Sequence, residues 1–413
     1  MKYVIDFHIH SQYSRGCSKE LTLFNLVKWA EIKGIGILGT GDFTFPAWRE
    51  AIAKELEEAE EGLYVLKGGS GAVRFIITTE ISLIYKQGDK CRRVHVCLLM
   101  SSRESAAKLS AELGKRGNIK SDGRPILGLS ARDLTELVLT IDEKALVIPA
   151  HAWTPWFSVF GSKSGFDSLE ECFGVWTPYI YAIETGLSAS VEMNWMCSFL
   201  DSLTLLSNSD AHSLENLGRE ANVFDLEKPS YNEIYEIIKN RDCKKFLYSI
   251  NFFPEEGKYH LDGHGKCGVR WMPLETEKNK GICSKCKRPV TKGVLNRVYE
   301  LADRELGEKP ETFVPFKSIV PLRQIISEVL GKGIQSKAVK TLYFDIAEKG
   351  GGEFPVLLDR SREELSLFVP PKCVEGIMKV RKGDVRVIGG YDGVFGTVKI
   401  WDEAERSGQR KLL

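Results

Sequence analysis

Strand-like and helix-like segments alternate through the first 250 residues, and this alternation constrains the fold more than any other feature. Runs rich in β-branched residues, such as 74–80 and 93–99, are separated by helix-like stretches such as 20–33 and 46–60. Alternation of this kind predicts a parallel α/β sheet or barrel. Six or seven such units favour a closed barrel over an open sheet. The strand candidates are 3–9, 35–40, 74–80, 93–99, 145–150, 180–184 and 203–208.

The remainder of the 413 residues has a different character, and the length itself indicates two or three domains. Residues 254–292 are rich in Gly, Lys and Cys and show no clear apolar period. The segment from Lys266 to Arg297 contains nine basic and two acidic residues, which gives a local net charge of +7. Residues 293–413 predict helices followed by a short β tail. We therefore expect an α/β barrel at 1–253, a zinc-binding module at 254–292 and a helical C-terminal DNA-binding domain at 293–413.

Composition narrows the class of protein. The net charge is +1, so a nucleic-acid partner has to be recognised through local patches rather than through a global field. No apolar run reaches the ~18 residues that span a membrane. Most of the ten cysteines are scattered singly, which fits a reducing compartment better than a disulfide scaffold. We expect a cytoplasmic protein without a membrane partner.

Histidines and carboxylates recur at the ends of the expected strands. Asp6, His8 and His10 alternate along one strand, so their side chains share a face. Asp210 and His212 repeat this spacing after the strand at 203–208. Asp42, Glu80 and His151 lie at the ends of further expected strands, and His95 lies in the strand expected at 93–99. Because the C-terminal ends of barrel strands meet on one face, residues distant in sequence converge there.

This residue set predicts a metal centre rather than isolated core histidines. A lone strand histidine is usually a satisfied core residue, but six coincidences at strand ends favour a shared site. Imidazoles and carboxylates without thiolates suit Zn²⁺, Mn²⁺ or Fe²⁺. Neighbouring ions can clamp a phosphate, activate water and stabilise the leaving oxygen, and Glu80 is the natural bridge. The expected ligands are His8, His10, Asp42, Glu80, His95, His151, Asp210 and His212, and the expected catalytic residues are Glu80, His151, Asp210 and His212.

A second ligand pattern lies in the cysteine-containing segment. His264 and Cys267 form an HxxC pair, and Cys283 and Cys286 form a CxxC pair after fifteen intervening residues. Two such pairs supply four ligands for a tetrahedral structural Zn²⁺. Nearby basic residues, including Lys285 and Arg288, could contact phosphates. The alternative is a solvated charged loop.

The strand-end motifs resemble the polymerase-and-histidinol-phosphatase (PHP) family. His8-Ile9-His10, Glu80, His95, His151 and Asp210-Ala211-His212 follow that family's order. The resemblance implies a distorted (β/α)₇ barrel with two or three divalent ions, Zn²⁺, Mn²⁺ or Mg²⁺. One departure is Gly41-Asp42-Phe43 where the family usually reads Thr-Asp-His. This departure removes a histidine, so either the third ion is lost or another side chain binds it.

Nearly the whole chain also resembles the endonuclease Q family of DNA repair enzymes. The resemblance implies nicking of DNA on the 5′ side of hypoxanthine, uracil, xanthine or an abasic site, and a sliding clamp as a further partner. The matching segments are 121–129, 149–158, 160–166, 184–188, 207–212, 218–222, 262–271 and 301–304.

DNA contacts are expected next to the metal ligands. Trp153, Trp156 and Phe157 follow His151 and could line a base pocket, although they could equally pack the barrel mouth. Lys163 and Ser164 lie in a glycine-flanked loop that could contact phosphate. Three alternatives stay open for the activity: a phosphatase acting on a small ester, an exonuclease, and a DNA-binding scaffold whose barrel has lost catalysis.

Overall fold

The computed structural model describes residues 1–401, and one mixed sheet organises the N-terminal two thirds of them. Along the main path the strand order is β15-β12-β11-β1-β2-β5-β4-β3, and β6, β7 and β8 extend the sheet from β5. The strands are β1 (Lys2–Asp6), β2 (Ile37–Gly39), β3 (Leu56–Glu60), β4 (Leu63–Leu66), β5 (Arg74–Gln87), β6 (Lys90–Met100), β7 (Ile126–Leu127), β8 (Leu146–Pro149), β11 (Ala221–Asp225), β12 (Phe246–Asn251) and β15 (Phe316–Ser318).

The sheet mixes parallel and antiparallel pairs, whereas alternation in the sequence predicts parallel ones. β1, β2 and β5 pair in parallel, but β5 and β6 form a long antiparallel hairpin, and β6 pairs antiparallel with β8. Two short strands, β9 (Ala182–Glu184) and β10 (Thr204–Leu206), form a separate parallel pair. A parallel bridge between Ile9 and Ala211 links the segment after β10 back to the segment after β1. The α/β class is therefore confirmed; closure into a seven-unit barrel stays a prediction.

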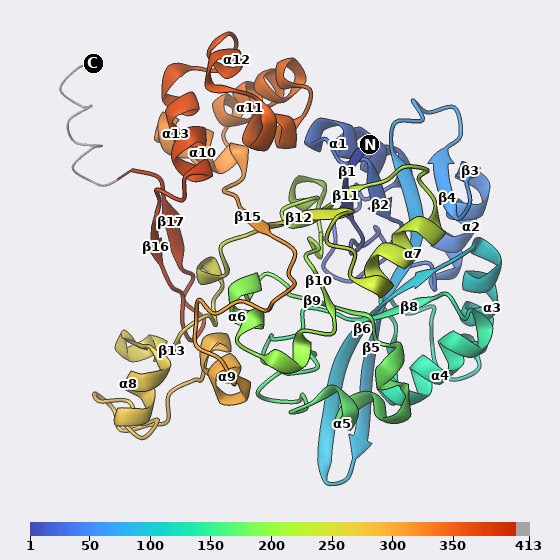
Figure 1. The fold of residues 1–413 in the computed structure, drawn as a ribbon, viewed down its shortest axis with the longest axis horizontal. Helices are drawn as coiled ribbons and strands as arrows, with labels where there is room; N and C mark the ends of the chain where they lie inside the picture. Colours follow the sequence, from blue (N-terminus) through green and yellow to red (C-terminus); the bar gives the residue numbers. More distant parts are fainter. Residues whose placement is uncertain (402–413) are drawn as a thin grey trace.

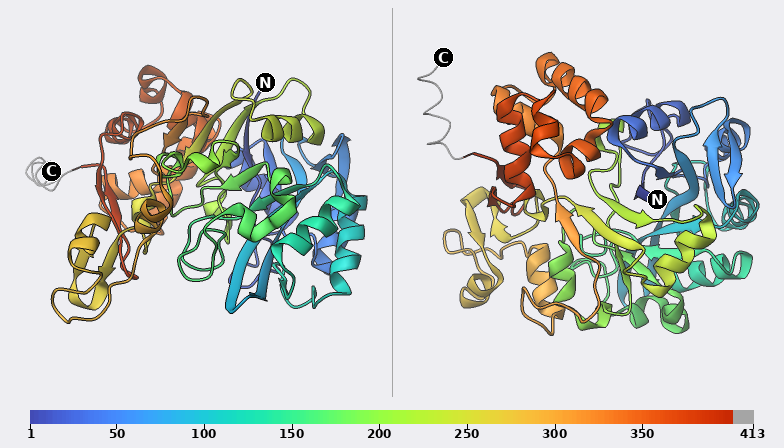
Figure 2. Two further views of the ribbon diagram at one scale, coloured as in Figure 1. Left: turned by 60° about the horizontal axis from the view of Figure 1, so that its bottom comes forward. Right: turned by 45° about the horizontal axis from the view of Figure 1, so that its top comes forward.

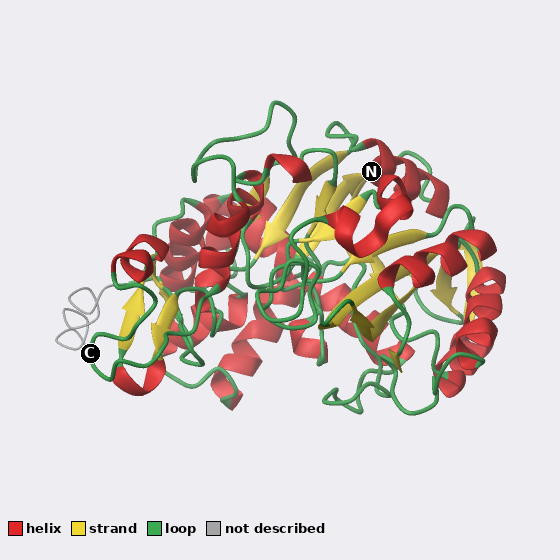
Figure 3. Ribbon diagram, turned by 90° about the horizontal axis from the view of Figure 1, so that it is seen from below, coloured by secondary structure: helices red, strands yellow, loops and turns green. Residues whose placement is uncertain are grey.

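Seven helices accompany the strands of the N-terminal part. Several begin at a hydroxyl N-cap: Ser102, Ser130 and Ser230 each accept a hydrogen bond from the amide three residues later. Seen from below, helices line the right-hand edge of the molecule, and strands lie inward of them (Figure 3). The helices are α1 (Leu23–Lys33), α2 (Pro46–Glu55), α3 (Arg103–Gly114), α4 (Ala131–Ile141), α5 (Leu169–Phe173), α6 (Val191–Trp195) and α7 (Tyr231–Asn240).

Both faces of the central strands are buried. Successive side chains along a strand point to opposite faces, so they pack into two different hydrophobic cores. In β5, Ile76 joins the smaller core, while Phe75 and Ile77 join the larger one. In β8, Ile148 joins the smaller core and Val147 the larger. Because every second residue faces each core, these strands read as continuous apolar runs in the sequence.

The C-terminal part lies to one side of the sheet (Figures 1 and 2). A hairpin of β13 and β14 precedes α8 and α9, and four further helices are followed by the antiparallel pair of β16 and β17, which confirms the expected short β tail. The elements are β13 (Asp262–His264), β14 (Val269–Trp271), α8 (Pro273–Lys278), α9 (Val294–Leu301), α10 (Leu322–Leu330), α11 (Lys337–Gly350), α12 (Arg362–Ser366), α13 (Pro371–Arg381), β16 (Arg386–Ile388) and β17 (Thr397–Lys399).

Several sequence-based boundaries are wrong. The strand expected at 74–80 continues to Gln87 as β5, so Glu80 lies within the strand rather than at its end. The helix expected at 46–60 ends at Glu55, and residues 56–60 form the strand β3, which pairs antiparallel with β4. The strand expected at 3–9 ends at Asp6, so His8 and His10 follow the strand rather than lie within it. The three domain ranges stay a prediction; β15, from the third range, adds a strand to the main sheet beside β12. Within residues 1–401, no helix is both long and apolar enough to span a bilayer.

Candidate metal-dependent active site

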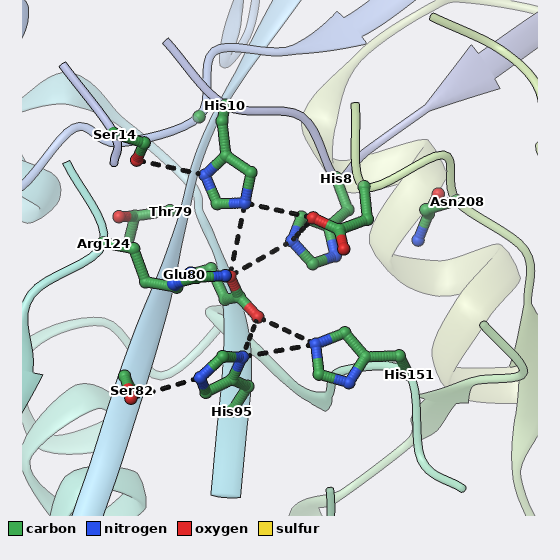
Figure 4. Close-up of polar contacts among 12 residues, drawn as sticks. His8, His10, Ser14, Thr79, Glu80, Ser82, His95, Arg124, His151 and Asn208 are labelled. Carbon is green, nitrogen blue, oxygen red and sulfur yellow. Dashed lines mark hydrogen bonds and ion pairs between the residues drawn. The ribbon is translucent and has the colours of Figure 1, made fainter. Parts of the chain in front are cut away.

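Histidines and acids converge around one buried carboxylate (Figure 4). Glu80 and His95 lie within β5 and β6, whereas His10, His151 and Asp210 follow β1, β8 and β10. Glu80, in β5, is fully shielded from solvent. Its Oε1 lies 2.7 Å from His95 Nδ1 and 3.1 Å from His151 Nε2. Its Oε2 lies 3.3 Å from His10 Nε2 and 3.6 Å from His8 Nε2. Four histidines that are up to 143 residues apart in the sequence thus surround Glu80.

The donor atoms form two groups that share Glu80. One group contains His8, His10, Glu80 and Asp210, and the other contains Glu80, His95 and His151; within each group the ligand atoms lie within 4.8 Å of one another. His8 Nε2 is buried and makes no hydrogen bond to any residue of the described chain. A buried imidazole nitrogen without a partner, facing carboxylate oxygens, fits a ligand to a cation. The residues therefore fit divalent cations held by imidazole nitrogens and carboxylate oxygens.

The electrostatics of the centre favour the ionised carboxylate. Burial alone would raise the pKa of Glu80, but the neighbouring His95, Arg124 and His8 hold it well below its ordinary value. Burial also opposes ionisation of Asp210, yet the hydrogen bond from His10 and the charge of His8 lower the pKa of that carboxyl. Both carboxylates are thus in the form that binds cations.

Asp42 and His212 lie beside the centre but outside both ligand groups. Asp42 Oδ1 lies 3.0 Å from His10 Nδ1, and Asp42 Oδ2 accepts hydrogen bonds from the Ser11 amide and hydroxyl and from Ser14 Oγ. A carboxylate on the far nitrogen of a ligating histidine orients the ring. His212 Nδ1 lies 2.8 Å from the carbonyl oxygen of Asp210, and its ring centroid lies 4.7 Å from that of His10. Phe43, which replaces the expected histidine, is buried in the larger core.

Sequence reasoning did not assign a role to Glu184, which sits behind His8. Both Glu184 oxygens lie 3.0 Å from His8 Nδ1. Glu184 also accepts hydrogen bonds from the His151 amide at 3.0 Å and from Asn208 Nδ2 at 2.8 Å. This contact holds the Nδ1–H tautomer of His8 and leaves Nε2 free to bind a cation. The only advance signal was its position at the end of the short strand β9.

Three residues of the centre have left-handed backbone conformations that are rare outside glycine. The φ angles are 48° at Asp42, 31° at His151 and 47° at Asp210. Each residue follows a strand, so the chain turns sharply where the side chain enters the centre. Such strain persists only when surrounding contacts impose it, and it concentrates at functional sites.

A basic groove is lined by the start of β6 and by the loop that follows His151. It has a volume of about 670 Å³ and includes Trp156, Lys163 and Ser164 from the loop after His151. Among its described lining residues, Asp167 is the one acid, and Arg297 pairs with it. The basic lining residues are Lys90, Arg92, Arg93, Lys163 and Arg297.

The aromatic candidates after His151 have different surroundings. Trp156 is 41% exposed and contacts Tyr259, with ring centroids 5.9 Å apart. The centroid of the Phe157 ring lies 4.7 Å from that of the His95 ring. The guanidinium carbon of Arg93 lies over the Phe157 ring, 5.8 Å from its centroid. Trp153 is buried, and its indole N–H donates to Asn194 Oδ1. Trp156 and Phe157 therefore border the groove and the centre, while Trp153 packs in the core.

The four expected structural zinc ligands also converge. The ligand atoms of His264, Cys267, Cys283 and Cys286 lie within 4.8 Å of one another. Backbone N–H groups of Cys286 and Lys285 lower the pKa of the Cys283 thiol, which favours the ligating thiolate. Lys285 Nζ donates to the carbonyl of Cys267 at 2.7 Å, and Arg288 is exposed on the same segment. The arrangement fits a closed tetrahedral site.

One family model and two curated proteins are similar in sequence to this chain. A family model for the MJ0043 C-terminal domain matches residues 321–384. The uncharacterized protein MJ0043 of Methanocaldococcus jannaschii is 35% identical over 255 residues, which are 60% of this chain but 31% of that protein, so the chain spans about a third of its length. The uncharacterized protein YqxK of Bacillus subtilis is 31% identical over 394 residues, covering 92% of this chain and 93% of YqxK.

Two solved structures match almost end to end. The lesion-specific endonuclease PfuEndoQ from Pyrococcus furiosus superposes with a TM-score of 0.87 at 32% identity, covering 98% of this chain and 97% of that one. An endonuclease Q bound to a 27-mer duplex substrate with an abasic lesion at its active site superposes with a TM-score of 0.85 at 33% identity, covering 98% of each chain. The family resemblance in the sequence is thereby confirmed: the chain belongs to the endonuclease Q family.

Proposed function

We propose that the chain is a metal-dependent DNA endonuclease that nicks the phosphodiester bond on the 5′ side of deaminated bases and abasic sites. One observation carries the proposal: two groups of metal-ligand atoms share the buried carboxylate of Glu80. The related endonuclease Q bound to a duplex with an abasic lesion supports DNA as the substrate. Hypoxanthine, uracil and xanthine are the proposed deaminated bases.

The proposed centre takes two divalent ions, Zn²⁺, Mn²⁺ or Mg²⁺. His8, His10 and Asp210 would hold one, His95 and His151 the other, and Glu80 would join them. Bound there, the ions would supply Lewis-acid activation of the phosphate and a nucleophilic water. Asp42 and Glu184 would orient His10 and His8 from behind.

The chain's own groups provide the remaining chemistry. Asp210 is 26% exposed, so its carboxylate faces both the ligand group and the open side, where it can accept a proton from the attacking water. His151 and His212 are 13% and 33% exposed, and they are placed to stabilise the oxygen that leaves. The 3′-hydroxyl and the 5′-phosphate are the expected product ends.

A lesion base has to leave the helical stack before it can be read. Extruding a base costs a few kcal/mol, and the cost is lowest for a mispaired or damaged one. Trp156 and Phe157 could wall the extruded base or fill the gap it leaves. Deaminated bases carry a carbonyl where an amino group stood, so a backbone N–H in the pocket would favour them over the parent bases.

The DNA backbone is proposed to follow the basic groove. Lys163 and its basic neighbours would contact phosphates, and Ser164 supports the loop through its hydroxyl contact with the carbonyl of Arg93 at 3.3 Å. Lys285 and Arg288 would extend the contacts onto a zinc-stabilised module held by His264, Cys267, Cys283 and Cys286. A sliding clamp stays a proposed partner suggested by the family alone.

The test uses an internally labelled duplex with a single deoxyinosine, an undamaged duplex and Mn²⁺ or Mg²⁺. We expect one nick in the lesion duplex, none in the undamaged duplex, and none with Asp210→Ala. Trimming from the ends would instead indicate an exonuclease, and hydrolysis of a small phosphate ester with intact DNA would indicate a phosphatase. DNA binding without any hydrolysis would indicate a scaffold.

A further inference from the structure

Arg124 reaches the centre from a loop that is fixed on several sides. Asp122 Oδ1 accepts hydrogen bonds from the amides of Arg124 at 3.0 Å and Arg15 at 3.2 Å. The Gly123 amide donates to the carbonyl of Tyr13 at 3.1 Å. A Cβ at Gly123 would lie 2.4 Å from Asp42 Oδ2, so only glycine lets the loop pack this closely. The loop therefore delivers the guanidinium to a defined position.

The guanidinium of Arg124 contacts Glu80 through one of its N–H groups, and its other N–H groups make no hydrogen bond to residues 1–401. Nη1 lies 3.0 Å from Glu80 Oε2, and in Figure 4 the side chain approaches Glu80 from the side opposite His151. Among residues 1–401, Glu80 is the one hydrogen-bond acceptor of this guanidinium, which carries five N–H donors. One bond to Glu80 leaves the other donors available to an oxyanion.

Exposure shows where a ligand can enter. The side chains of His8, His10 and Glu80 are at most 2% exposed, so that side of the centre is closed. Arg124 is 25% exposed and Asp210 is 26% exposed, so these two border the open side. An anion entering the centre would meet Arg124 as a cation already in place.

The charge of Arg124 is permanent. An arginine guanidinium does not lose its proton in proteins. A planar, always charged guanidinium matches two phosphate oxygens at once. A lysine at the same place could offer charge but not the paired geometry.

We propose that Arg124 binds a non-bridging oxygen of the scissile phosphate and so acts as a substrate-binding catalytic residue. The inference rests on the proposed function, since it deepens the same site. The competing role is purely internal: Arg124 would neutralise Glu80 and position it for the ions without touching substrate.

The test separates these roles with inorganic phosphate as the probe. Isothermal titration of Mn²⁺-loaded wild type, Arg124→Gln and Arg124→Lys measures phosphate affinity, and elemental analysis measures bound Mn²⁺. We expect Arg124→Gln to weaken phosphate binding about tenfold to a hundredfold, Arg124→Lys to weaken it less, and both to retain wild-type Mn²⁺. Arg116→Gln, which removes an exposed guanidinium in the turn after α3, should bind phosphate as wild type does.

Kinetics add a second reading with the lesion duplex. If Arg124 contacts the phosphate, kcat/KM falls in Arg124→Gln while bound Mn²⁺ stays constant, and Arg124→Lys recovers part of the loss. Unchanged phosphate affinity, or a loss of Mn²⁺ that accounts for the defect, would overturn the inference. If wild type binds phosphate through Arg124 but does not nick DNA, the proposed function fails and the role of Arg124 stands. If wild type binds no phosphate, the role of Arg124 fails.

Discussion

A buried ion pair ties the helical C-terminal part to the first helix of the chain, and breaking it should be costly. Lys33 Nζ, at the end of α1, lies 2.6 Å from Glu353 Oε2, and the two side chains are 6% and 4% exposed. Glu353 also accepts hydrogen bonds from Tyr343 at 2.8 Å and from the Leu322 amide at 2.9 Å. One carboxylate thus satisfies three groups from α1, α10 and α11.

Replacing Glu353 with alanine leaves the Lys33 ammonium buried without a counter-charge. Losing one partner of a buried pair costs about 3–5 kcal/mol, because the remaining charge keeps its desolvation penalty. We therefore expect Glu353→Ala to lower the free energy of unfolding by about 4 kcal/mol. The double variant Lys33→Met, Glu353→Leu should recover part of this loss, because the unpaired charge is then absent, whereas the Tyr343 hydroxyl and the Leu322 amide still lack their acceptor.

Urea unfolding followed by tryptophan fluorescence measures this effect, and Trp29, whose ring centroid lies 6.5 Å from that of Tyr343, reports locally. The control Asp345→Ala removes an exposed pair with Lys349 and should cost at most about 1 kcal/mol. A loss below about 1 kcal/mol for Glu353→Ala would refute the reasoning.

The pair also sets a pH dependence. Burial alone would raise the pKa of Glu353, but Lys33 and the hydrogen bonds lower it below its model-peptide value of 4.5. A depressed folded-state pKa means that the pair's contribution is complete above the unfolded value and is lost as the pH falls through the folded value. In wild type this part of the stability should therefore persist at pH 6 and fade under strongly acidic conditions.

Three further predictions concern separate parts of the chain. Burial raises the pKa of Glu220 to about 8, so the folded state favours the protonated carboxyl and stability should fall as the pH rises from 4.5 toward 8. In urea unfolding, Glu220→Gln should have a higher unfolding free energy than wild type at pH 8, and the difference should be much smaller at pH 5. Lys163→Ser should reduce the slope of log affinity against log salt by about 0.9 for duplex DNA, whereas Lys120→Ser on an exposed loop should not; equal slopes would count against the groove. Cys283→Ser should release one zinc per chain in a chromogenic chelator assay and make residues 254–292 sensitive to protease. The control Cys91→Ser should do neither. Retention of zinc by Cys283→Ser would contradict the structural site.

The metal-ligand candidates could be predicted because their pattern is local. His8 and His10 are two residues apart, and Asp210 and His212 repeat this spacing, so the sequence predicts one site although all four residues follow strands rather than lie within them. Convergence followed from the rule that strand ends meet on one face of an α/β fold. The structure brings these residues around Glu80, and their individual roles stay proposals.

The partners behind the ligands could not be predicted, because their contacts span the chain. Glu184 meets His8 across 176 positions, and Arg124 meets Glu80 across 44. Neither residue has a local signature: Glu184 ends a short strand, and Arg124 lies in a polar loop. Only tertiary packing defines such partners.

The boundary error at residues 56–60 has a similar cause. The segment Leu56-Glu57-Glu58-Ala59-Glu60 consists of strong helix formers, so propensity extends the helix. In the structure Leu56 is buried while Glu57 and Glu58 are exposed, and the segment pairs with β4. Pairing at the edge of a sheet outweighs a propensity difference of a few tenths of a kcal/mol per residue. The antiparallel β5–β6 hairpin is a further departure from the expected parallel sheet.

The central claim is that Glu80 joins two ions in a DNA-cutting centre, and one paired measurement tests it. Wild type and Glu80→Gln would be loaded with Mn²⁺, analysed for bound metal and assayed on the deoxyinosine duplex. The account predicts two Mn²⁺ per chain at the centre and a single nick for wild type. For Glu80→Gln it predicts the loss of at least one Mn²⁺ and a rate lower by at least about a thousandfold. A variant that keeps both ions and nicks at the wild-type rate would contradict the account.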